Sequence, residues 1–371
     1  AVIQSSSATT VMVVGFVNSG VMTLGQAVGV IMGANLGTSV TSWLLSLTSL
    51  QSDNVFLSLL KPESFTPVLA LIGVILYMFV KDRKKKDIGL ILLGFSVLMF
   101  GMEMMAGSVE PLKDNEAFVR VLTVFEQPIL GVIAGTVVTV IVQSSSASVG
   151  ILQALTFTGS ISNGTAIPII MGQNIGTCVS ALISSIGANK NAKRAAFIHL
   201  YFNVIAASVL LIIFYCVKAF LPSEILAQPA TALSIAVIHT VFKLIALAML
   251  MPFTNQLEKL ACLTVHDSEE KEKDELLDER LLITPPVAIQ RSKDVEKQMA
   301  VEAGDTLYAA FDMIHGGYTQ AAGQKVREGE AHGDMYEDKL GTYLVKISGC
   351  SLSDHDSLEV SKLLHIIGDL E

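Results

Sequence analysis

Two short polar segments of identical sequence carry the side chains best suited to bind an ion. The segment QSSSA occurs at Gln4–Ala8 and again at Gln143–Ala147, and it contains amide and hydroxyl groups but no charged residue. At the start of a helix, such donors act together with free backbone N–H groups and the positive end of the helix dipole, which favour an anion. An oxyanion such as phosphate would then be held by neutral donors. The candidate substrate-binding residues are Gln4, Ser5, Ser6, Ser7, Gln143, Ser144, Ser145 and Ser146.

A second pair of segments could bind a cation. IMGANLGTSV (Ile31–Val40) and IMGQNIGTCV (Ile170–Val179) place asparagine and threonine between glycines, which can interrupt a helix and expose carbonyl and hydroxyl oxygens to a hard cation. None of the four segments contains a carboxylate or histidine, the groups on which proton relays in membranes usually depend. A metal cation bound by neutral oxygens is therefore favoured, and the candidate sodium ligands are Asn35, Thr38, Ser39, Asn174 and Thr177.

Both pairs of segments are separated by the same offset of 139 residues, with no gap. At this offset Gly20 also falls on Gly159, and Ala27 on Ala166. Two separated motifs in register are hard to obtain by chance, so the sequence predicts an internal duplication.

Charge and hydropathy divide the chain into two regions. Of the 371 residues, 51% are hydrophobic and 16% charged. The first 252 residues carry 13 Lys and Arg against 10 Asp and Glu, whereas the remaining 119 carry 12 against 24. A membrane region followed by an acidic, solvated tail is predicted. The tail has no paired cysteines, which suits a reducing cytoplasm.

The first region contains apolar stretches long enough to cross a membrane, for which roughly 20 residues are needed. The clearest are Thr66–Val80, Ile88–Gly107, Ala195–Val217 and Thr231–Met251. Between Gln127, expected outside, and Lys190, expected inside, the chain must cross the membrane an odd number of times. A re-entrant hairpin at 128–158, with QSSS at its tip, followed by one broken span at 165–187 meets this requirement.

The charges of the loops predict how the two copies are oriented. Cytoplasmic loops are enriched in Lys and Arg, so the basic loops at 81–86 and 190–194 are expected inside, and the less basic stretches at 51–65 and 109–127 outside. The first copy then enters the membrane from the opposite side to the second. Inverted repeats with discontinuous helices are typical of secondary transporters. The second copy is preceded by a span and a hairpin arm without counterparts before Gln4, so part of the first repeat is expected to be missing from this chain.

These motifs resemble those of the type II sodium-dependent phosphate cotransporter family, which has two QSSS motifs and paired G-x-N-I-G-T segments. The resemblance covers about 1–252, and Leu36 departs from the isoleucine of the first G-x-N-I-G-T segment. It implies electrochemically driven uptake of inorganic phosphate, with phosphate and sodium held between the two hairpins by the residues named above.

After Pro252 the charged run His266–Arg280 predicts a solvated linker or an exposed helix, and from Pro285 apolar residues return at helical spacing. They include Val301, Leu307, Phe311, Ile314, Leu358, Leu363, Leu364, Ile366 and Ile367. This part resembles the PhoU-like helical domain of bacterial members of the family. The closing LLHIIGDLE looks like the start of that domain's motif, so the domain is expected to be truncated.

Other readings fit part of these observations. A membrane phosphate sensor would signal through the tail without net transport, and a structural anchor would be insensitive to changes at both hairpin tips. A transporter of another oxyanion is a closer rival, because neutral donors do not exclude sulfate on charge alone. The small residues of the motifs would also suit close helix packing. No GxSxG elbow supports a serine nucleophile, so the chain is not expected to be an enzyme. His239 and Lys243, one helical turn apart, remain open as residues at the cavity.

The predicted fold is all-α: a polytopic membrane protein with inverted repeats, re-entrant hairpins and broken helices, followed by a cytoplasmic helical bundle. The expected domains are a transport domain at 1–252 (repeat 1 at about 1–80, repeat 2 at about 88–217), a charged linker at 253–284 and a truncated PhoU-like domain at 285–371. The chain is expected to lie in the cell membrane and to import phosphate with co-transported sodium. The lipid bilayer is a further partner, a homodimer is left open, and no nucleic acid is expected.

Overall fold

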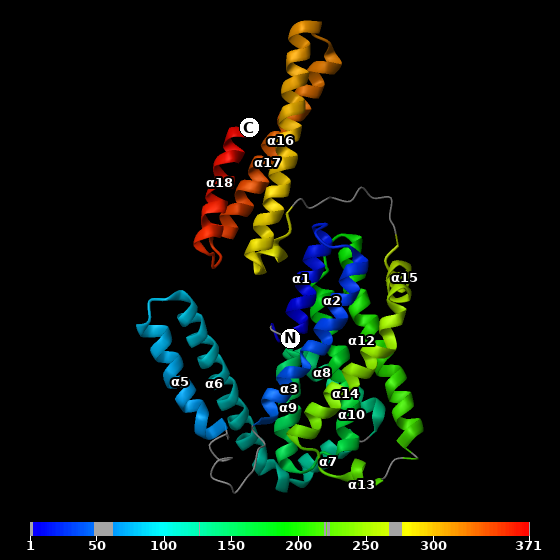
Figure 1. The fold of residues 1–371 in the computed structure, drawn as a ribbon. Coiled ribbons are helices and arrows are strands. Elements are labelled where there is room, and N and C mark those ends of the chain that lie inside the picture. Colours follow the sequence, from blue (N-terminus) through cyan, green and yellow to red (C-terminus); the bar gives the residue numbers. More distant parts are fainter. Residues whose placement is uncertain are drawn as a thin grey trace. The chain divides into compact units, whose positions relative to one another are not determined.

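The computed structural model describes residues 3–47, 62–125, 127–218, 220, 223–266 and 277–370, and within them the secondary structure is helical (Figure 1). The chain forms two compact units. Unit 1 comprises Ala1–Thr10, Val28–Ser184 and Ala196–Thr264, and unit 2 comprises Val11–Ala27, Ser185–Ala195 and Val265–Glu371. The stretch 51–61 of the predicted outside loop and the stretch 267–276 of the charged run lie outside the described residues.

Five helical stretches of the described part are long and apolar enough to cross a membrane. They are Leu24–Ser46, Arg83–Leu112, Asn163–Ser184, Lys190–Cys216 and Ala232–Thr264. Three of the predicted spans correspond to α6 (Arg83–Val109), α12 (Lys190–Lys218) and α14 (Ala232–Leu250), whereas the fourth, at 66–80, forms α5 (Pro62–Phe79), which contains one of the shorter apolar helices. The expectation of an all-α polytopic membrane protein is confirmed.

The duplication extends to the backbone. The first copy forms α1 (Ser6–Asn18), α2 (Leu24–Gly37) and α3 (Ser39–Ser46), and the second forms α9 (Ser145–Leu155), α10 (Asn163–Gly176) and α11 (Cys178–Ser184). Each pair of helices begins at the same offset as the sequence motifs. Gly20 and Gly159, which follow the first helix of each copy, have φ of 73° and 69°, the left-handed conformation that glycine adopts without steric cost.

The predicted broken spans are interrupted at one residue each, Thr38 between α2 and α3 and Thr177 between α10 and α11. Both residues keep right-handed helical dihedral angles. Thr38 Oγ1 donates to the carbonyl of Asn35 at 2.9 Å, and Thr177 Oγ1 to that of Asn174 at 2.6 Å. A threonine hydroxyl that bonds a preceding carbonyl competes with the helical hydrogen bonds, which explains an interruption without extended unwinding.

Glycines of the second motif bring α10 into backbone contact with α8 (Pro128–Val142). A Cβ atom at Gly172 would overlap the carbonyl of Val132, and one at Gly176 would lie 2.7 Å from the carbonyl oxygen of Thr136. Small residues allow helices in a membrane to approach this closely. Gly172 and Gly176 therefore serve helix packing, the role left open beside their expected role as helix breakers.

A helical hairpin of α5 and α6 uses the same device. A Cβ at Gly73 would lie 2.9 Å from the carbonyl oxygen of Gly89, and one at Gly89 would lie 2.8 Å from that of Gly73. Ser96 Oγ adds a hydrogen bond of 3.0 Å to the carbonyl of Thr66. The remaining helices of unit 1 are η2 (Glu110–Asp114), α7 (Glu116–Val124), η3 (Thr156–Thr158), α13 (Ser223–Ala227), η4 (Met251–Phe253) and α15 (Thr254–Thr264).

In unit 2 the tail forms η5 (Glu279–Ile283) and three helices, α16 (Pro285–Gly316), α17 (Gln320–Ser348) and α18 (Asp354–Leu370). Their core includes Met299, Leu340 and Leu363, together with Ile367. Of the predicted apolar positions, Leu363 and Ile367 belong to this core, and the rest are exposed: Val301, Leu307, Phe311, Ile314, Leu358, Leu364 and Ile366. The four on α16 lie in its second half, and Figure 1 shows the far ends of α16 and α17 extending past α18.

Asp278 joins three separate segments of unit 2. Its carboxylate, in a residue only 2% exposed, accepts hydrogen bonds from Asn18 Nδ2 at 2.7 Å and from Arg280 Nη1 at 3.0 Å. Asn18 in turn accepts from the amide of Asn189 at 2.7 Å, and Tyr343 donates to the carbonyl of Asp278 at 2.7 Å. The end of α1, the loop before α12 and the tail therefore meet at one buried carboxylate.

Candidate functional site

The two QSSS segments adopt the same conformation at the start of α1 and α9. Gln4 and Gln143 both have φ of 53°, the left-handed region that residues with a Cβ rarely enter. The next residue caps the helix: Ser5 Oγ accepts from the Ala8 amide at 3.1 Å, and Ser144 Oγ from the Ala147 amide at 3.2 Å. Strained residues of this kind cluster at functional sites.

Unit 1 brings the two segments together. Ser146 Oγ donates to the backbone carbonyl of Gln4 at 3.5 Å, which links the start of α9 to the start of α1. Gln4 Oε1 also accepts from Thr41 Oγ1 of α3 at 2.5 Å. Of the other predicted residues, Ser6 is buried, and Ser7 and Ser145 are half-buried in the first turns of α1 and α9.

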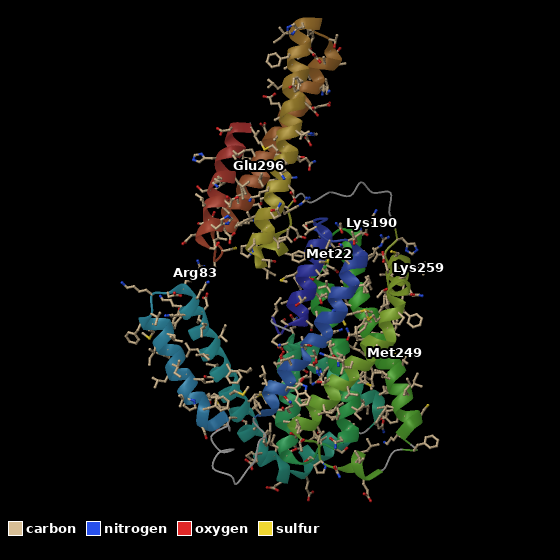
Figure 2. All side chains as sticks on the ribbon, viewed as in Figure 1. Met22, Arg83, Lys190, Met249, Lys259 and Glu296 are labelled. Atoms are coloured by element: carbon tan, nitrogen blue, oxygen red, sulfur yellow. The ribbon has the colours of Figure 1, made fainter. Side chains whose placement is uncertain are left out.

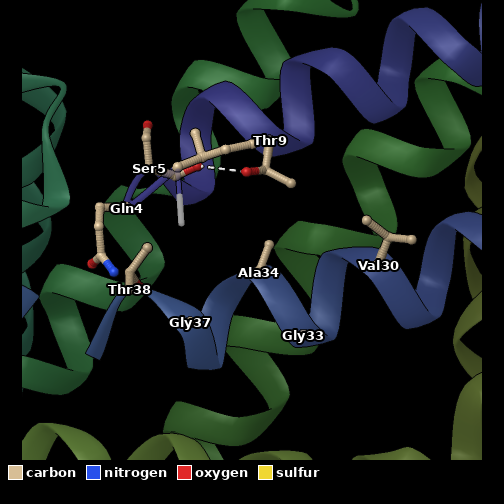
Figure 3. A pocket seen from close by; sticks show the side chains of 9 residues that line it. Gln4, Ser5, Thr9, Val30, Gly33, Ala34, Gly37 and Thr38 are labelled. Atoms are coloured by element: carbon tan, nitrogen blue, oxygen red, sulfur yellow. Dashed lines mark hydrogen bonds between the residues drawn. The ribbon is translucent and has the colours of Figure 1, made fainter. Parts of the chain in front are cut away.

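A cavity of about 270 Å³ opens beside the first QSSS segment (Figure 3). At about 30 Å³ per water molecule, it has room for a small hydrated ion. In Figure 3 Gln4 and Ser5 face Thr38 and the glycines of α2. The lining residues are Ile3, Gln4, Ser5, Thr9, Val30, Gly33, Ala34, Gly37 and Thr38.

The cavity wall on α2 has a counterpart in the second copy. Gly33 and Gly37 correspond to Gly172 and Gly176, which there pack against α8, whereas a Cβ at Gly33 would meet no atom within 4 Å. The polar side, formed by Gln4, Ser5 and Thr38, is the part that can bind an ion.

The predicted cation ligands make different hydrogen bonds within unit 1. Thr38 lines the cavity, and Ser39 Oγ donates to the carbonyl of Leu36 at 2.7 Å. Asn174 Nδ2 and Thr177 Oγ1 bond carbonyls of their own helix. Asn35 Nδ2 donates to Asn203 Oδ1 at 3.1 Å.

Several buried oxygens of unit 1 have no hydrogen-bond partner among the described residues. Four of them are Ser6 Oγ, Asn35 Oδ1, Gln153 Oε1 and Gln173 Oε1. Leaving such a group unpaired costs about 1–3 kcal/mol, so exceptions in a native structure call for an explanation such as a bound water or ion. All four oxygens are neutral, which is the ligand type expected for sodium at these repeats.

Three residues outside the motifs extend this network. Gln153 Nε2 donates to the carbonyls of Ser42 and Ala232, both at 2.9 Å. Asn203 receives the bond from Asn35, and Lys243 Nζ donates to Thr38 Oγ1 at 2.6 Å. A polar side chain inside an apolar span was the available signal for Gln153 and Asn203. Lys243 was left open by the sequence, and the structure brings it to a predicted ligand.

Comparison with known proteins identifies the family. The model of the Na+/Pi-cotransporter family matches residues 1–107 and again residues 97–251. The chain is 28% identical to "Uncharacterized protein YqeW" of Bacillus subtilis, over 71% of this chain and 81% of that protein. It is 23% identical over its whole length to "Putative inorganic phosphate export protein YjbB" of Escherichia coli, of which it spans 66%.

Another relative matches at higher identity over a shorter stretch. The chain is 36% identical to "Sodium-dependent phosphate transport protein 2A" of Rattus norvegicus over 123 residues, 31% of this chain and 18% of that protein. No solved structure matches the chain. The family model covers the region of the repeated motifs and most of the chain, and the resemblance seen in these motifs is confirmed: the chain belongs to the Na+/Pi-cotransporter family.

Proposed function

We propose that this protein is a sodium-coupled secondary transporter that imports inorganic phosphate, which binds at the two QSSS tips. The contact between Ser146 and the carbonyl of Gln4 carries the proposal, because it brings two capped helix N-termini together in unit 1. Each N-terminus offers free amides and the positive end of a helix dipole to one anion. The caps occupy the amides of Ala8 and Ala147, so the preceding amides and serine hydroxyls remain as donors.

Sodium coupling is proposed from the family and from the neutral oxygens without partners. A cation bound at Asn35 or Gln173 would satisfy a buried oxygen and neutralise part of the charge of a phosphate nearby. Because binding of each ion favours the other, the two would cross the membrane together. Sodium is thus a co-transported substrate in this scheme.

Hydrogen bonds at the two ends of α12 also support an inverted arrangement with a cytoplasmic tail. The loop before α12 bonds Asn18 at the end of α1, whereas the chain after α12 bonds the turn after α9, through Ala230 N to Ile161 O at 2.7 Å. If α12 crosses the membrane once, the turns that close the two hairpins lie on opposite sides. Met22 and Lys190, both in unit 2, lie at the same end of the helices in Figure 2, and the basic loop there favours the cytoplasm.

Of these two relatives, one has a name that states a direction and the other a name that states only sodium dependence. The rat protein is named as sodium-dependent, and the Escherichia coli protein as an exporter. A symporter runs in whichever direction the combined electrochemical gradients favour, so an inward sodium gradient would drive import. Export as the physiological role is the second candidate, and it predicts phosphate movement that an inward sodium gradient does not drive.

Uptake into proteoliposomes tests the proposal. The full-length protein is expected to accumulate radiolabelled phosphate several-fold above its internal equilibrium under an inward sodium gradient, and not under a matched potassium gradient. Sulfate in excess is expected not to compete. Phosphate binding without accumulation would favour the sensor, and accumulation of sulfate instead would assign another oxyanion.

We also propose that the tail is a PhoU-like domain that regulates transport through Asp278. Asp278→Ala removes the acceptor for Asn18 and Arg280, and hydrogen bonds to a charged group contribute about 1.5–3 kcal/mol each. The variant is expected to unfold at a lower temperature than the parent and to lose any difference in uptake between cells grown at high and low phosphate. Asp294→Ala, at an exposed site on α16, is the matched control.

A double-mutant cycle sharpens this test. Asn18→Ala is expected to destabilise the protein as well, and the combined variant is expected to lose less than the sum, because both substitutions break the same bond. If the losses of stability from the two substitutions add, Asn18 and Asp278 do not stabilise the protein through one shared bond. A stable Asp278→Ala variant that still responds to phosphate supply would remove the proposed regulatory route.

A further inference from the structure

Lys243 is a basic residue in the interior of unit 1. The residue lies on α14, is 5% exposed, and donates from Nζ to Thr38 Oγ1 at 2.6 Å. None of the ion pairs found among the described residues includes Lys243. Ionisable residues within membrane spans are costly and usually functional.

The partner of this ammonium is one of the oxygens that the repeat assigns to sodium. Thr38 Oγ1 donates its proton to the carbonyl of Asn35, so its lone pairs face the ammonium as they would face a metal cation. Asn35 Oδ1 is buried and has no partner among the described residues, which makes it a second neutral oxygen of the same segment.

The second copy keeps the threonine but not the ammonium. Thr177 Oγ1 donates to the carbonyl of Asn174 just as Thr38 does to that of Asn35. Position 243 lies outside the duplicated motifs, and the hydrogen bonds of the described residues bring no lysine to Thr177. The two repeat-related positions therefore differ by one basic side chain.

From this asymmetry we infer that the Lys243 ammonium takes the place of one co-transported sodium ion at Thr38. This inference rests on the proposed function, in which the Asn and Thr segments bind sodium. Both cations carry one positive charge and are satisfied by neutral oxygens. A tethered ammonium keeps a positive charge beside the cavity that Gln4, Ser5 and Thr38 line, but it does not cross the membrane, so each phosphate needs one sodium ion fewer.

A purely structural role for Lys243 is the alternative to exclude. The same face of α14 contacts α3 through His239, whose Nδ1 lies 3.3 Å from Ser42 Oγ, and through Thr240, whose Oγ1 accepts from Trp43 Nε1 at 2.9 Å. A lysine that only fastened α14 to the first repeat would contribute to stability and not to the number of ions transported. The number of sodium ions transported per phosphate therefore distinguishes the two roles of Lys243.

The test compares the parent with Lys243→Met in proteoliposomes, with radiolabelled sodium and phosphate counted in parallel. Methionine keeps the length of the side chain and removes its charge. The variant is expected to move one more sodium ion per phosphate and to show a steeper dependence of uptake on sodium concentration. Adding Thr38→Val should return the ratio to that of the parent. Lys259→Met, at an exposed lysine of unit 1 labelled in Figure 2, is expected to change nothing.

If Lys243→Met moves the same number of sodium ions per phosphate as the parent, the inference is overturned. If, in addition, its KM for phosphate is raised, the lysine acts instead as a counter-charge for the anion. If Lys243→Met does not transport, sodium alone is titrated against the purified variant. Its unfolding temperature is then expected to rise with sodium more than that of the parent, and no difference refutes the inference. Failure of the parent to couple phosphate to sodium would instead refute the proposed function, which separates the two results.

Discussion

Replacing Gln143 by alanine is expected to leave the fold intact and to reduce sodium-dependent phosphate uptake by about tenfold or more. Gln143 joins α8 to α9, and its side chain is exposed at the tip of the hairpin. Loss of one hydrogen bond to a charged group costs about 1.5–3 kcal/mol, which corresponds to roughly ten- to hundredfold in affinity. Alanine and glutamine both carry a Cβ and incur the same steric cost at a φ of 53°, so the stability of the fold should change little.

Glycine at the same position separates binding from folding. An L-residue in the left-handed region costs about 1–2 kcal/mol, and glycine avoids this cost. Gln143→Gly is therefore expected to raise the unfolding temperature and yet to lose uptake as alanine does. A higher unfolding temperature together with a loss of uptake would show that the strained backbone at Gln143 is retained for function.

Two further variants complete the series: asparagine at position 143, and alanine at a distant glutamine as a control. Asparagine tolerates the left-handed region and retains an amide one methylene shorter, so Gln143→Asn should keep part of the uptake. Gln290→Ala, at an exposed position on α16, should change neither uptake nor stability. Uptake that follows unfolding temperature across the three Gln143 variants would make this residue structural. Uptake by Gln143→Gly at the parent's rate would remove it from the site.

The spans and the duplication were predictable because they depend on local patterns. Twenty apolar residues identify a span wherever it packs, and a motif repeated in register identifies its copy. The helices α1 and α9 begin at equivalent residues, Ser6 and Ser145, because a capping serine of the repeated motif precedes each of them. Loop charge adds a prediction of sidedness that the described contacts support but that stays a prediction.

The polar network was harder to predict because it joins residues far apart in the chain. The bonds from Asn35 to Asn203 and from Lys243 to Thr38 each span more than 160 residues. A hydropathy pattern shows that α12 and α14 are apolar, but with apolar residues around most of each helix it does not show which face meets the repeats. Glycine is ambiguous for another reason, because the absence of a side chain suits both a helix break and a close helix contact.

Gly172→Leu is expected to prevent recovery of folded protein. A Cβ at Gly172 would overlap the carbonyl of Val132 and would lie 2.9 Å from the amide nitrogen of Thr136, and both are backbone atoms that no change of rotamer can move. Separating α8 from α10 would also break the bond from Thr136 Oγ1 to the carbonyl of Gly172, at 3.0 Å. The readout is the monodisperse peak in size-exclusion chromatography in detergent, compared with Gly94→Ala at an exposed, uncrowded site on α6.

Gly172→Ala decides between the two roles of the motif glycines by the sign of its effect. If Gly172 only weakened the helix, alanine would stabilise it by about 1 kcal/mol, because glycine is the poorer helix former by that amount. If the close contact with α8 governs, alanine destabilises, since even one methyl group must displace the backbone of Val132. We expect a lower unfolding temperature for Gly172→Ala and an equal or higher one for Gly94→Ala. A stabilised Gly172→Ala variant would return this glycine to its predicted role as a helix breaker beside the cation ligands.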